Sequence, residues 1–258
     1  MATKTSNSST KKTYSYLGPV GTFTELALAQ VPEAKGAKWH PVANVQEAID
    51  NVISGHSARA VIPIENSIEG GVSATLDALA ATEGIRIFGE YLVPVSFNLV
   101  ARPGVALKDV VTVATHPVAY AQTHKWLAAN LAGHTYLPAT STAAAAAALL
   151  HADPIANAAV AASTITNHYD LKVIAKNIGE YKNAQTRFIQ IGLAGKAPAS
   201  TGRDKTSVII EMPNDRPGAL LEMLEQFAVR GVNLSRIESR PIGDRLGRYR
   251  FNVDAQGH

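Results

Sequence analysis

The chain has 258 residues, of which 46% are apolar and 17% charged, so it can form the core of one large domain or two unequal ones. It contains no cysteine, which excludes disulfide scaffolds, thiolate zinc sites, iron–sulfur clusters and cysteine nucleophiles. The net charge of +3 comes from Lys4, Lys11 and Lys12 in an acid-free stretch, and the remaining basic and acidic residues are equal in number. Nucleic-acid binding therefore lacks its electrostatic basis.

The N-terminal residues 1–13 are rich in Ser, Thr and Lys and lack the apolar centre of a signal peptide. We interpret them as a disordered leader. No segment reaches the roughly 20 consecutive apolar residues that a membrane span needs. The sequence therefore predicts a cytoplasmic protein that has no membrane partner.

Strands and helices alternate from Tyr14 onward. In the first part of the chain the residue patterns predict strands at 14–17, 38–42 and 59–65, helices at 23–31, 44–53 and 72–81, and a long β-rich stretch at 85–102. Asn44 stands where the cap of the second helix is expected.

The alternation continues through the middle of the chain. Strands are expected at 110–115, 135–140, 157–163, 171–178 and 186–192, with helices at 118–131 and 141–150 and a helix-like segment at 164–169. This order favours α/β layers with mainly parallel sheets. The length of the block 14–193 suggests two such lobes.

The composition changes at 194–205, where Gly, Pro, Ser and charged residues without apolar period mark a linker. The remaining segment 206–258 reads as a second domain: strands are expected at 206–213, 234–242 and 248–255, and a helix at 219–230. The order β-α-β-β is three-quarters of a ferredoxin-like unit, so this domain is expected to be incomplete.

Four polar loops each follow a strand and open a helix; they lie at 18–25, 64–71, 114–120 and 139–144. Ligands of open α/β sheets bind at the carboxyl ends of strands, where free helix N–H groups suit anions. The loops therefore suggest a site for a small, oxygen-rich, anionic ligand. The alternative is that their Ser, Thr and Asn side chains only cap the helices.

Familiar cofactor motifs are absent. The loop GPVGT has neither the Lys of a phosphate-binding loop nor the third glycine of a dinucleotide fingerprint, and the eight histidines show no metal-ligand spacing. We expect no metal and no cofactor. His116, before a proline at a strand end, and Glu65, at the end of an apolar strand, are candidate site residues. For Glu65 the alternative is ordinary capping of the next loop.

Arg187 lies inside the alternating strand at 186–192, beside Phe188 and Ile189. An arginine in a half-buried strand requires an anionic partner. The sequence leaves two partners open, the carboxylate of a ligand or a structural Asp or Glu of the chain itself.

Several segments together resemble the signature segments of the monofunctional prephenate dehydratases. They are LGPVGTFTE at 17–25, PIENSIEGGVSATLD at 63–77, THPVAYAQ at 115–122 and TRF at 186–188. GALLEMLEQF at 218–227 and IESRP at 237–241 resemble the regulatory ACT domain of the same family. The order and spacing of all these segments follow the family pattern.

The resemblance implies a bilobal catalytic domain similar to periplasmic binding proteins, with the active site between the lobes, followed by the ACT domain. It implies conversion of prephenate to phenylpyruvate, CO2 and water in L-phenylalanine biosynthesis, without a cofactor. It also implies a homodimer or homotetramer with L-phenylalanine as allosteric effector.

Residue roles follow from the same resemblance. Thr186 would donate a hydrogen bond to the leaving hydroxyl, and Arg187 would hold a substrate carboxylate. The substrate-binding candidates are Thr22, Glu65, Asn66, Ser67, His116 and Phe188. The effector-site candidates are Gly218, Ala219, Leu220, Asn233, Leu234, Glu238, Ser239 and Arg240. The chain departs from the family pattern at Ala184, where an asparagine is usual.

Two other functions remain open at this point. One is arogenate dehydratase, whose substrate carries an amine in place of the keto group. The other is a non-catalytic sensor that binds an amino acid or a carboxylate in the same bilobal fold. The intact TRF segment argues against the sensor.

Overall fold

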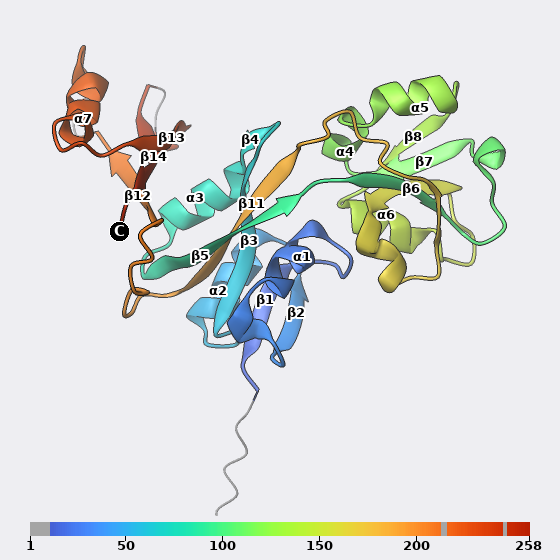
Figure 1. Ribbon diagram of the computed structural model, residues 1–258, viewed down its shortest axis with the longest axis horizontal. Coiled ribbons are helices and arrows are strands. Elements are labelled where there is room, and N and C mark those ends of the chain that lie inside the picture. The colour runs from blue at the N-terminus through green and yellow to red at the C-terminus, as the bar shows by residue number, and fades with distance from the viewer. Residues whose placement is uncertain (1–10, 213–215, 245–246) are drawn as a thin grey trace, which may run out of the picture.

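The computed structural model describes residues 11–212, 216–244 and 247–258. They form two lobes and a C-terminal domain (Figure 1). Residues 1–10 of the predicted leader lie outside the described part, and the first strand already begins at Thr13. Within the described residues, no helix has both the length and the apolar character that crossing a bilayer requires.

Lobe 1 consists of residues 13–94 and 185–193. Its strands are β1 (Thr13–Leu17), β2 (Lys38–Val42), β3 (Arg59–Asn66), β4 (Gly70–Gly71), β5 (Ile85–Pro94) and β11 (Gln185–Leu193). They pair in the order β2-β1-β3-β11-β5, with β4 beside the end of β3. The helices are α1 (Phe23–Ala29), α2 (Val45–Ile53) and α3 (Ser73–Ala81), with a 3-10 turn at Pro32–Ala34.

Helix α2 shows how the sequence builds this lobe. Asn44 accepts a hydrogen bond from the Glu47 amide at 2.9 Å, and the Glu47 carboxylate accepts one from the Ala43 amide at 2.8 Å. This reciprocal cap satisfies two amides that the helix itself leaves unpaired. Ile49 and Val52 bury the inner face against Ile62 of β3 and its neighbours. The predicted Asn44 cap is confirmed.

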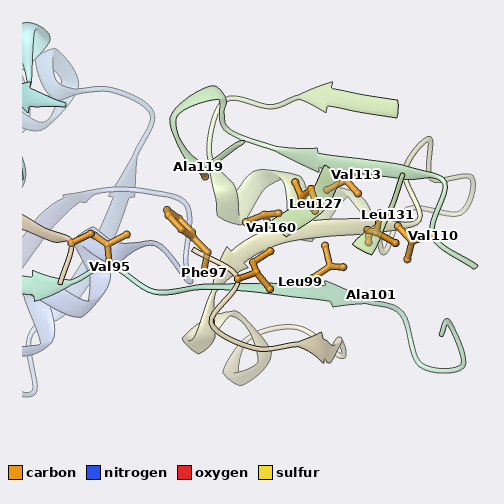
Figure 2. Close-up of a cluster of buried hydrophobic side chains, with 13 residues drawn as sticks. Val95, Phe97, Leu99, Ala101, Val110, Val113, Ala119, Leu127, Leu131 and Val160 are labelled. Atoms are coloured by element: carbon orange, nitrogen blue, oxygen red, sulfur yellow. The ribbon is translucent and has the colours of Figure 1, made fainter. Parts of the chain in front are cut away.

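Lobe 2 consists of residues 95–184. Its strands are β6 (Phe97–Ala101), β7 (Thr112–Thr115), β8 (Thr135–Pro138), β9 (Ala158–Ala162) and β10 (Lys172–Ala175), in the order β10-β6-β9-β7-β8. The helices are α4 (Pro117–Ala121), α5 (His124–Asn130) and α6 (Thr142–Ala148), with 3-10 turns at Leu107–Asp109 and Ser163–Asn167. Figure 2 shows its core, in which Phe97 and Leu99 of β6 pack with Val160 of β9 and Leu127 of α5.

The sheets are mixed, which corrects the expectation of mainly parallel sheets. β1 pairs in parallel with β2 and β3, and β7 with β8 and β9, but β11 is antiparallel to both neighbours and β6 to both of its own. Apart from the pairing of β3 with the short β4, every antiparallel pair that the structure describes in the two lobes includes β6 or β11, the strands that follow the crossings between the lobes. Their direction follows from the crossing and not from a local residue pattern.

The single helix expected at 118–131 is also wrong. The chain forms α4 and α5 instead, separated at Thr123, whose hydroxyl donates to the Ala119 carbonyl at 2.8 Å. Thr123 has φ −124° and ψ 0°, outside the helical region. A threonine that bonds its hydroxyl back to the preceding turn competes with the helix ladder. The helix-like segment at 164–169 is a 3-10 turn, Ser163–Asn167.

The chain crosses between the lobes twice, from β5 into β6 and from lobe 2 back into β11 (Figure 1). The two crossings are hydrogen-bonded to each other, because the Val95 amide donates to the Ala184 carbonyl at 2.8 Å. Thr186 follows the second crossing directly. The start of β11 is therefore the part of lobe 1 whose position depends most directly on lobe 2.

The C-terminal domain contains β12 (Lys205–Glu211), α7 (Ala219–Ala228), β13 (Leu234–Pro241) and β14 (Tyr249–Gln256). Its sheet has the order β12-β14-β13, with the third strand of the domain in the centre. The predicted β-α-β-β order is present. β12 ends at Glu211, and position 213, where the strand was expected to end, lies outside the described residues.

The two faces of this sheet differ in polarity. Arg236, Glu238 and Arg240 alternate along β13 with Ile237 and Ser239. On β14, Arg250, Asn252 and Asp254 lie on the same face as the three charged residues, because the registered pairs include Arg236 with Asp254 and Arg240 with Arg250. This polar face contacts lobe 1, whereas α7 lies on the side away from it (Figure 1).

Candidate active site

Thr186 of β11 and Asn66 of β3 form the centre of the candidate site. They are directly opposite in the sheet register, and the Asn66 Nδ2 donates to the Thr186 Oγ1 at 3.0 Å. Asn66 Oδ1 accepts from the amides of Ile68 and Glu69, which fixes the orientation of the side-chain amide. Because the Thr186 oxygen already accepts this bond, its own hydroxyl hydrogen is available for a ligand.

Ser67 ties the loop after β3 to the start of β11. Its amide donates to the Gln185 carbonyl, and its Oγ accepts from the Gln185 amide, both at 2.9 Å. The loop and the strand therefore move as one unit. The hydroxyl hydrogen of Ser67 is not used in either bond.

Two contacts join the carboxyl end of β1 in lobe 1 to lobe 2. Phe23, at the start of α1, lies edge-on to Phe97 of lobe 2 with ring centroids 5.7 Å apart. The Glu25 carboxylate lies 3.0 Å from His168 Nε2, which follows the 3-10 turn at the end of β9. Sequence reasoning did not single out Glu25 or His168, because partners 143 positions apart leave no local pattern.

Thr22 caps helix α1, which agrees with the alternative that the polar side chains of these loops only cap the helices. Its hydroxyl oxygen accepts from the Glu25 amide at 3.4 Å, and its hydrogen is donated to the Leu17 carbonyl at 3.1 Å. The side chain is thus engaged in both senses at the start of α1. It positions the loop after β1 and has no free donor for a ligand.

His116 stands at the start of α4, at the end of β7. Its Nδ1 accepts from the Val118 amide at 3.3 Å. Burial lowers the pKa of His116, so the ring is neutral at pH 7. Because Nδ1 accepts, the proton of the neutral ring resides on Nε2, which makes that nitrogen a hydrogen-bond donor.

Arg187 points to the opposite face of β11 from Thr186. Its guanidinium donates to Asp254, to Glu90 at 2.6 Å and to Glu65 at 3.3 Å, and its side chain is only 8% exposed. Although burial lowers the pKa of Arg187, the hydrogen bond and charge of Asp254 and those of Glu90 raise it overall. The sequence left two kinds of partner open for Arg187, a ligand carboxylate or a carboxylate of the chain itself. In the structure its partners are carboxylates of the chain. These partners differ from the substrate carboxylate that the family resemblance implied for Arg187.

Two other substrate-binding candidates lie away from Thr186. The Glu65 carboxylate faces Arg187 and comes within 4.0 Å of Arg236 in the C-terminal domain. Phe188 is 2% exposed and packs in the core cluster that contains Tyr16 and Leu28. The surroundings of both differ from those expected: Glu65 belongs to the contact between domains, and Phe188 to the core of lobe 1. Thr186, Asn66 and Ser67 are the predicted residues that the structure brings together.

The effector-site candidates separate into groups. Glu238 and Arg240 lie on the face of the C-terminal sheet that contacts lobe 1, where Arg240 donates to Asp77 of α3 at 2.6 Å. Ser239 lies on the opposite face. The helix-start and loop candidates are Gly218, Ala219, Leu220, Asn233 and Leu234; Gly218, with φ +86°, caps α7. The polar side chains of the ESRP segment thus do not converge within one protomer.

Asp254 is fully buried and remains charged. Burial raises the pKa of Asp254, but hydrogen bonds from Arg236, Ser207 and Arg187 outweigh this effect and lower the pKa to about 2. The usual value is 3.8. The stabilisation from this lowered pKa is complete above pH 4 and is lost as the pH falls through about 2.

We therefore expect the melting temperature of the wild-type protein to fall between pH 4 and pH 2 more steeply than that of Asp254→Asn. The amide cannot titrate, so this part of the pH dependence is absent from the variant. Differential scanning calorimetry at steps of 0.5 pH unit measures both slopes, because one such step changes the stability by up to about 0.7 kcal/mol, half of the ~1.4 kcal/mol for a full unit. Equal slopes would contradict the ionised state of Asp254 in the folded protein.

Among the described residues, no group of three or more His, Asp or Glu side chains gathers in a way that could hold a metal ion. The site instead offers the hydroxyl and amide donors of Thr186, Ser67 and Asn66 from lobe 1, while the His116 imidazole stands at a strand end of lobe 2. This donor set suits an anionic ligand with several oxygens.

A two-lobed α/β fold with two chain crossings and polar donors at the strand ends defines a small-molecule-binding class of protein. The prephenate dehydratase family model matches residues 14–196 of this chain. The chain belongs to the prephenate dehydratase family.

Individual relatives agree with this assignment. The chain is 43% identical over 251 residues to the prephenate dehydratase of Mycobacterium marinum, covering 94% of this chain and 79% of the relative. It is 51% identical to the prephenate dehydratase from Arthrobacter aurescens that was solved in complex with L-Phe, with a TM-score of 0.90 over 95% of this chain and 81% of the other.

The fold also occurs in a protein described as a quorum-quenching acylase. That protein is 27% identical to this chain, with a TM-score of 0.82 over 96% of this chain and 88% of the other. The fold alone therefore does not determine the reaction, and the argument for function rests on the family and on the site.

Proposed function

We propose that this protein is a prephenate dehydratase, a lyase that converts prephenate to phenylpyruvate, CO2 and water in L-phenylalanine biosynthesis. The observation that carries the proposal is the Asn66–Thr186 hydrogen bond, which leaves the Thr186 hydroxyl hydrogen free at the junction of the lobes. The family supports the same reaction.

The chemistry needs little from the protein. Prephenate carries two carboxylates and a ring hydroxyl. The electron pair of the bond to the ring carboxylate moves into the ring as CO2 leaves, the ring becomes aromatic, and the C–O bond to the hydroxyl breaks. One proton is taken up, so that the hydroxyl leaves as water. The protein must bind a dianion and stabilise the charge that develops on the departing oxygen.

Thr186 supplies the hydrogen bond to the departing oxygen. A threonine hydroxyl is a weak acid, so it acts as an oriented donor or within a proton relay. Asn66 fixes its orientation by occupying one acceptor position of the oxygen. Ser67 and the Nε2–H of His116 are further donors for the oxygens of the substrate, and Thr22 positions the loop after β1.

Production of phenylpyruvate from prephenate at neutral pH, compared with a sample without enzyme, tests this function. The comparison is needed because acid alone drives the same conversion. Running arogenate in parallel and comparing kcat/KM separates the two dehydratase activities. Binding of either substrate without turnover would favour the sensor and overturn the enzyme.

The variant Asn66→Asp tests the role of the amide. The carboxylate keeps the oxygen that accepts from Ile68 and Glu69 but cannot donate to Thr186, so the Thr186 hydroxyl turns its hydrogen toward the new carboxylate. The added negative charge also repels the substrate. We expect kcat to fall and KM to rise, each by about tenfold or more, consistent with ~1.4 kcal/mol for each factor of ten.

Asn130→Asp is the matched control for this variant. Its side-chain amide donates to the Trp126 carbonyl at an exposed helix end of lobe 2. We expect this control to keep the wild-type kcat and KM in the same steady-state assay. Wild-type kinetics in Asn66→Asp would remove Asn66 from the site.

We also propose that the C-terminal domain is an ACT domain that binds L-phenylalanine as a feedback effector, in a homodimer or homotetramer in the cytoplasm. The Arthrobacter relative was solved with L-Phe, which supports this. Because Ser239 and Glu238 lie on opposite faces of the sheet, a complete site needs residues beyond one ESRP segment. Isothermal calorimetry with L-phenylalanine tests the proposal, and no heat of binding at millimolar ligand would reject it.

A further inference from the structure

Arg187 and Thr186 are neighbours on β11 that serve different parts of the molecule. Thr186 is paired across the sheet with Asn66 and bonded to it, whereas Arg187 is bonded to Asp254 of β14 in the C-terminal domain. A single peptide unit thus connects the candidate donor to a contact between domains. The proposed reaction does not itself use this arginine.

The contact is firmly held on the C-terminal side. The Asp254 carboxylate accepts from Ser207 of β12 at 2.5 Å and from Arg236 of β13 at 2.9 Å, as well as from Arg187. Asp254 is 0% exposed. It therefore cannot exchange Arg187 for water without losing a buried charge pair. All three strands of the C-terminal sheet contribute to the position of this one carboxylate.

On the side of lobe 1, the two neighbours of β11 hold Arg187 differently. The pairing of β11 with β5 is regular from Gln185 to Gln190, but the pairing with β3 shifts register between Arg187 and Phe188, so the ladder is interrupted on the β3 side just after Arg187. Glu90 of β5 accepts from Arg187 at 2.6 Å and also from Lys205 of β12 at 3.0 Å. The local position of β11 therefore depends on side-chain anchors that include the C-terminal domain.

We propose that Arg187 is a positioning residue through which the C-terminal domain holds Thr186 in its productive place. The inference rests on the proposed function. Asp254 and Glu90 fix the guanidinium, the guanidinium fixes the backbone of β11 at the interrupted ladder, and the backbone fixes the Thr186 hydroxyl. A donor displaced by about 1 Å costs on the order of a hundredfold in rate, so a small movement here is sufficient.

A second ion-pair group offers a matched comparison. Asp77 of α3 accepts from Arg240 at 2.6 Å and from Arg250 at 2.7 Å, and it also joins lobe 1 to the C-terminal sheet. Its side chain is 43% exposed, and it does not contact β11 through these bonds. Asp77→Asn thus weakens the attachment of the domain without touching Arg187.

The experiment compares Asp254→Asn with Asp77→Asn in the full chain. We expect Asp254→Asn to lower kcat for prephenate about tenfold with KM within about twofold, because binding groups on both lobes remain while the donor is displaced. Asp77→Asn should keep kcat within about twofold. Hydrogen–deuterium exchange should accelerate in peptides that cover 185–188 for Asp254→Asn and not for Asp77→Asn, whether or not the protein turns over prephenate.

Glu90→Gln keeps the buried pair of Arg187 with Asp254 and removes the charged partner of Arg187 on β5. It therefore provides a second test of the inference if Asp254→Asn does not fold. We expect a smaller loss of kcat in Glu90→Gln, about threefold, with the same localised increase in exchange. Equal losses in Asp254→Asn and Asp77→Asn, or unchanged exchange at 185–188 in both Asp254→Asn and Glu90→Gln, would overturn the inference. A wild-type protein inactive on prephenate rejects the proposed reaction instead, and the exchange result still decides the role of Arg187.

Discussion

The variant Thr186→Ala is expected to fold normally and to lose about 10²–10³ in kcat, which corresponds to roughly 3–4 kcal/mol of transition-state stabilisation. The hydroxyl is bonded to Asn66, and within the described residues its removal leaves the Asn66 Nδ2 as the hydrogen-bond partner that is perturbed. That partner is partly exposed and can bond water instead. The measurement is steady-state kinetics on prephenate, with circular dichroism and the melting temperature as tests of folding.

Thr186→Ser is the matched control for this prediction. It keeps the hydroxyl and removes only the methyl group at a position that is 9% exposed. We expect Thr186→Ser to retain kcat within about tenfold, since the donor remains but is less well restrained. If Thr186→Ala keeps near-normal kcat, or if the serine variant is as inactive as the alanine variant, the hydroxyl is not the operative donor.

The opposite directions of Thr186 and Arg187 could have been predicted from the sequence. Successive residues of a strand point to opposite faces of its sheet, so two adjacent residues of a strand cannot both face one ligand directly. The family resemblance assigned both to catalysis, and the period of the strand argued against this. The partner of Arg187 could not be predicted, because Asp254 lies 67 positions away in another domain.

The fold was predictable where local chemistry determines it. The capped helix α2 was predicted because Asn44 and the buried spacing of Val45, Ile49 and Val52 are local signals. The mixed sheets were not, because the direction of β11 depends on the second crossing between the lobes. The break at Thr123 depends on one hydroxyl bond that competes with the helix ladder, which no hydrophobic period reports.

The strands of the C-terminal domain were predicted from the sequence, but the contact of their polar face with lobe 1 was not. The alternation of β13 predicts that Arg236, Glu238 and Arg240 share one face. It does not say whether solvent, an effector or another domain covers that face. In the structure, lobe 1 covers it through Asp77 and Arg187, which gives the ESRP segment a structural role beside any role in effector binding.

Loss of the buried ion pair between Arg187 and Asp254 is expected to have a large effect on the stability of the protein. We expect Asp254→Leu to lower the free energy of unfolding by about 3–5 kcal/mol, because it leaves the Arg187 and Arg236 guanidiniums without their shared buried carboxylate. Arg187→Met should cost less than Asp254→Leu, since Asp254 keeps Arg236 and Ser207 as partners. Because both are buried, solvent screening reduces these effects only weakly.

The double variant Arg187→Met/Asp254→Leu distinguishes a true pair from two independent losses. If the two residues interact directly, the double variant is more stable than the sum of the single losses predicts, by about 0.5–3 kcal/mol. Urea unfolding measures this, because urea does not screen charges. Fluorescence of Trp39 and Trp126 follows lobes 1 and 2, while far-ultraviolet circular dichroism follows the whole chain. Strict additivity of the two single losses would show that Arg187 is stabilised mainly by Glu90 and Glu65, and that the C-terminal domain contributes little to its position.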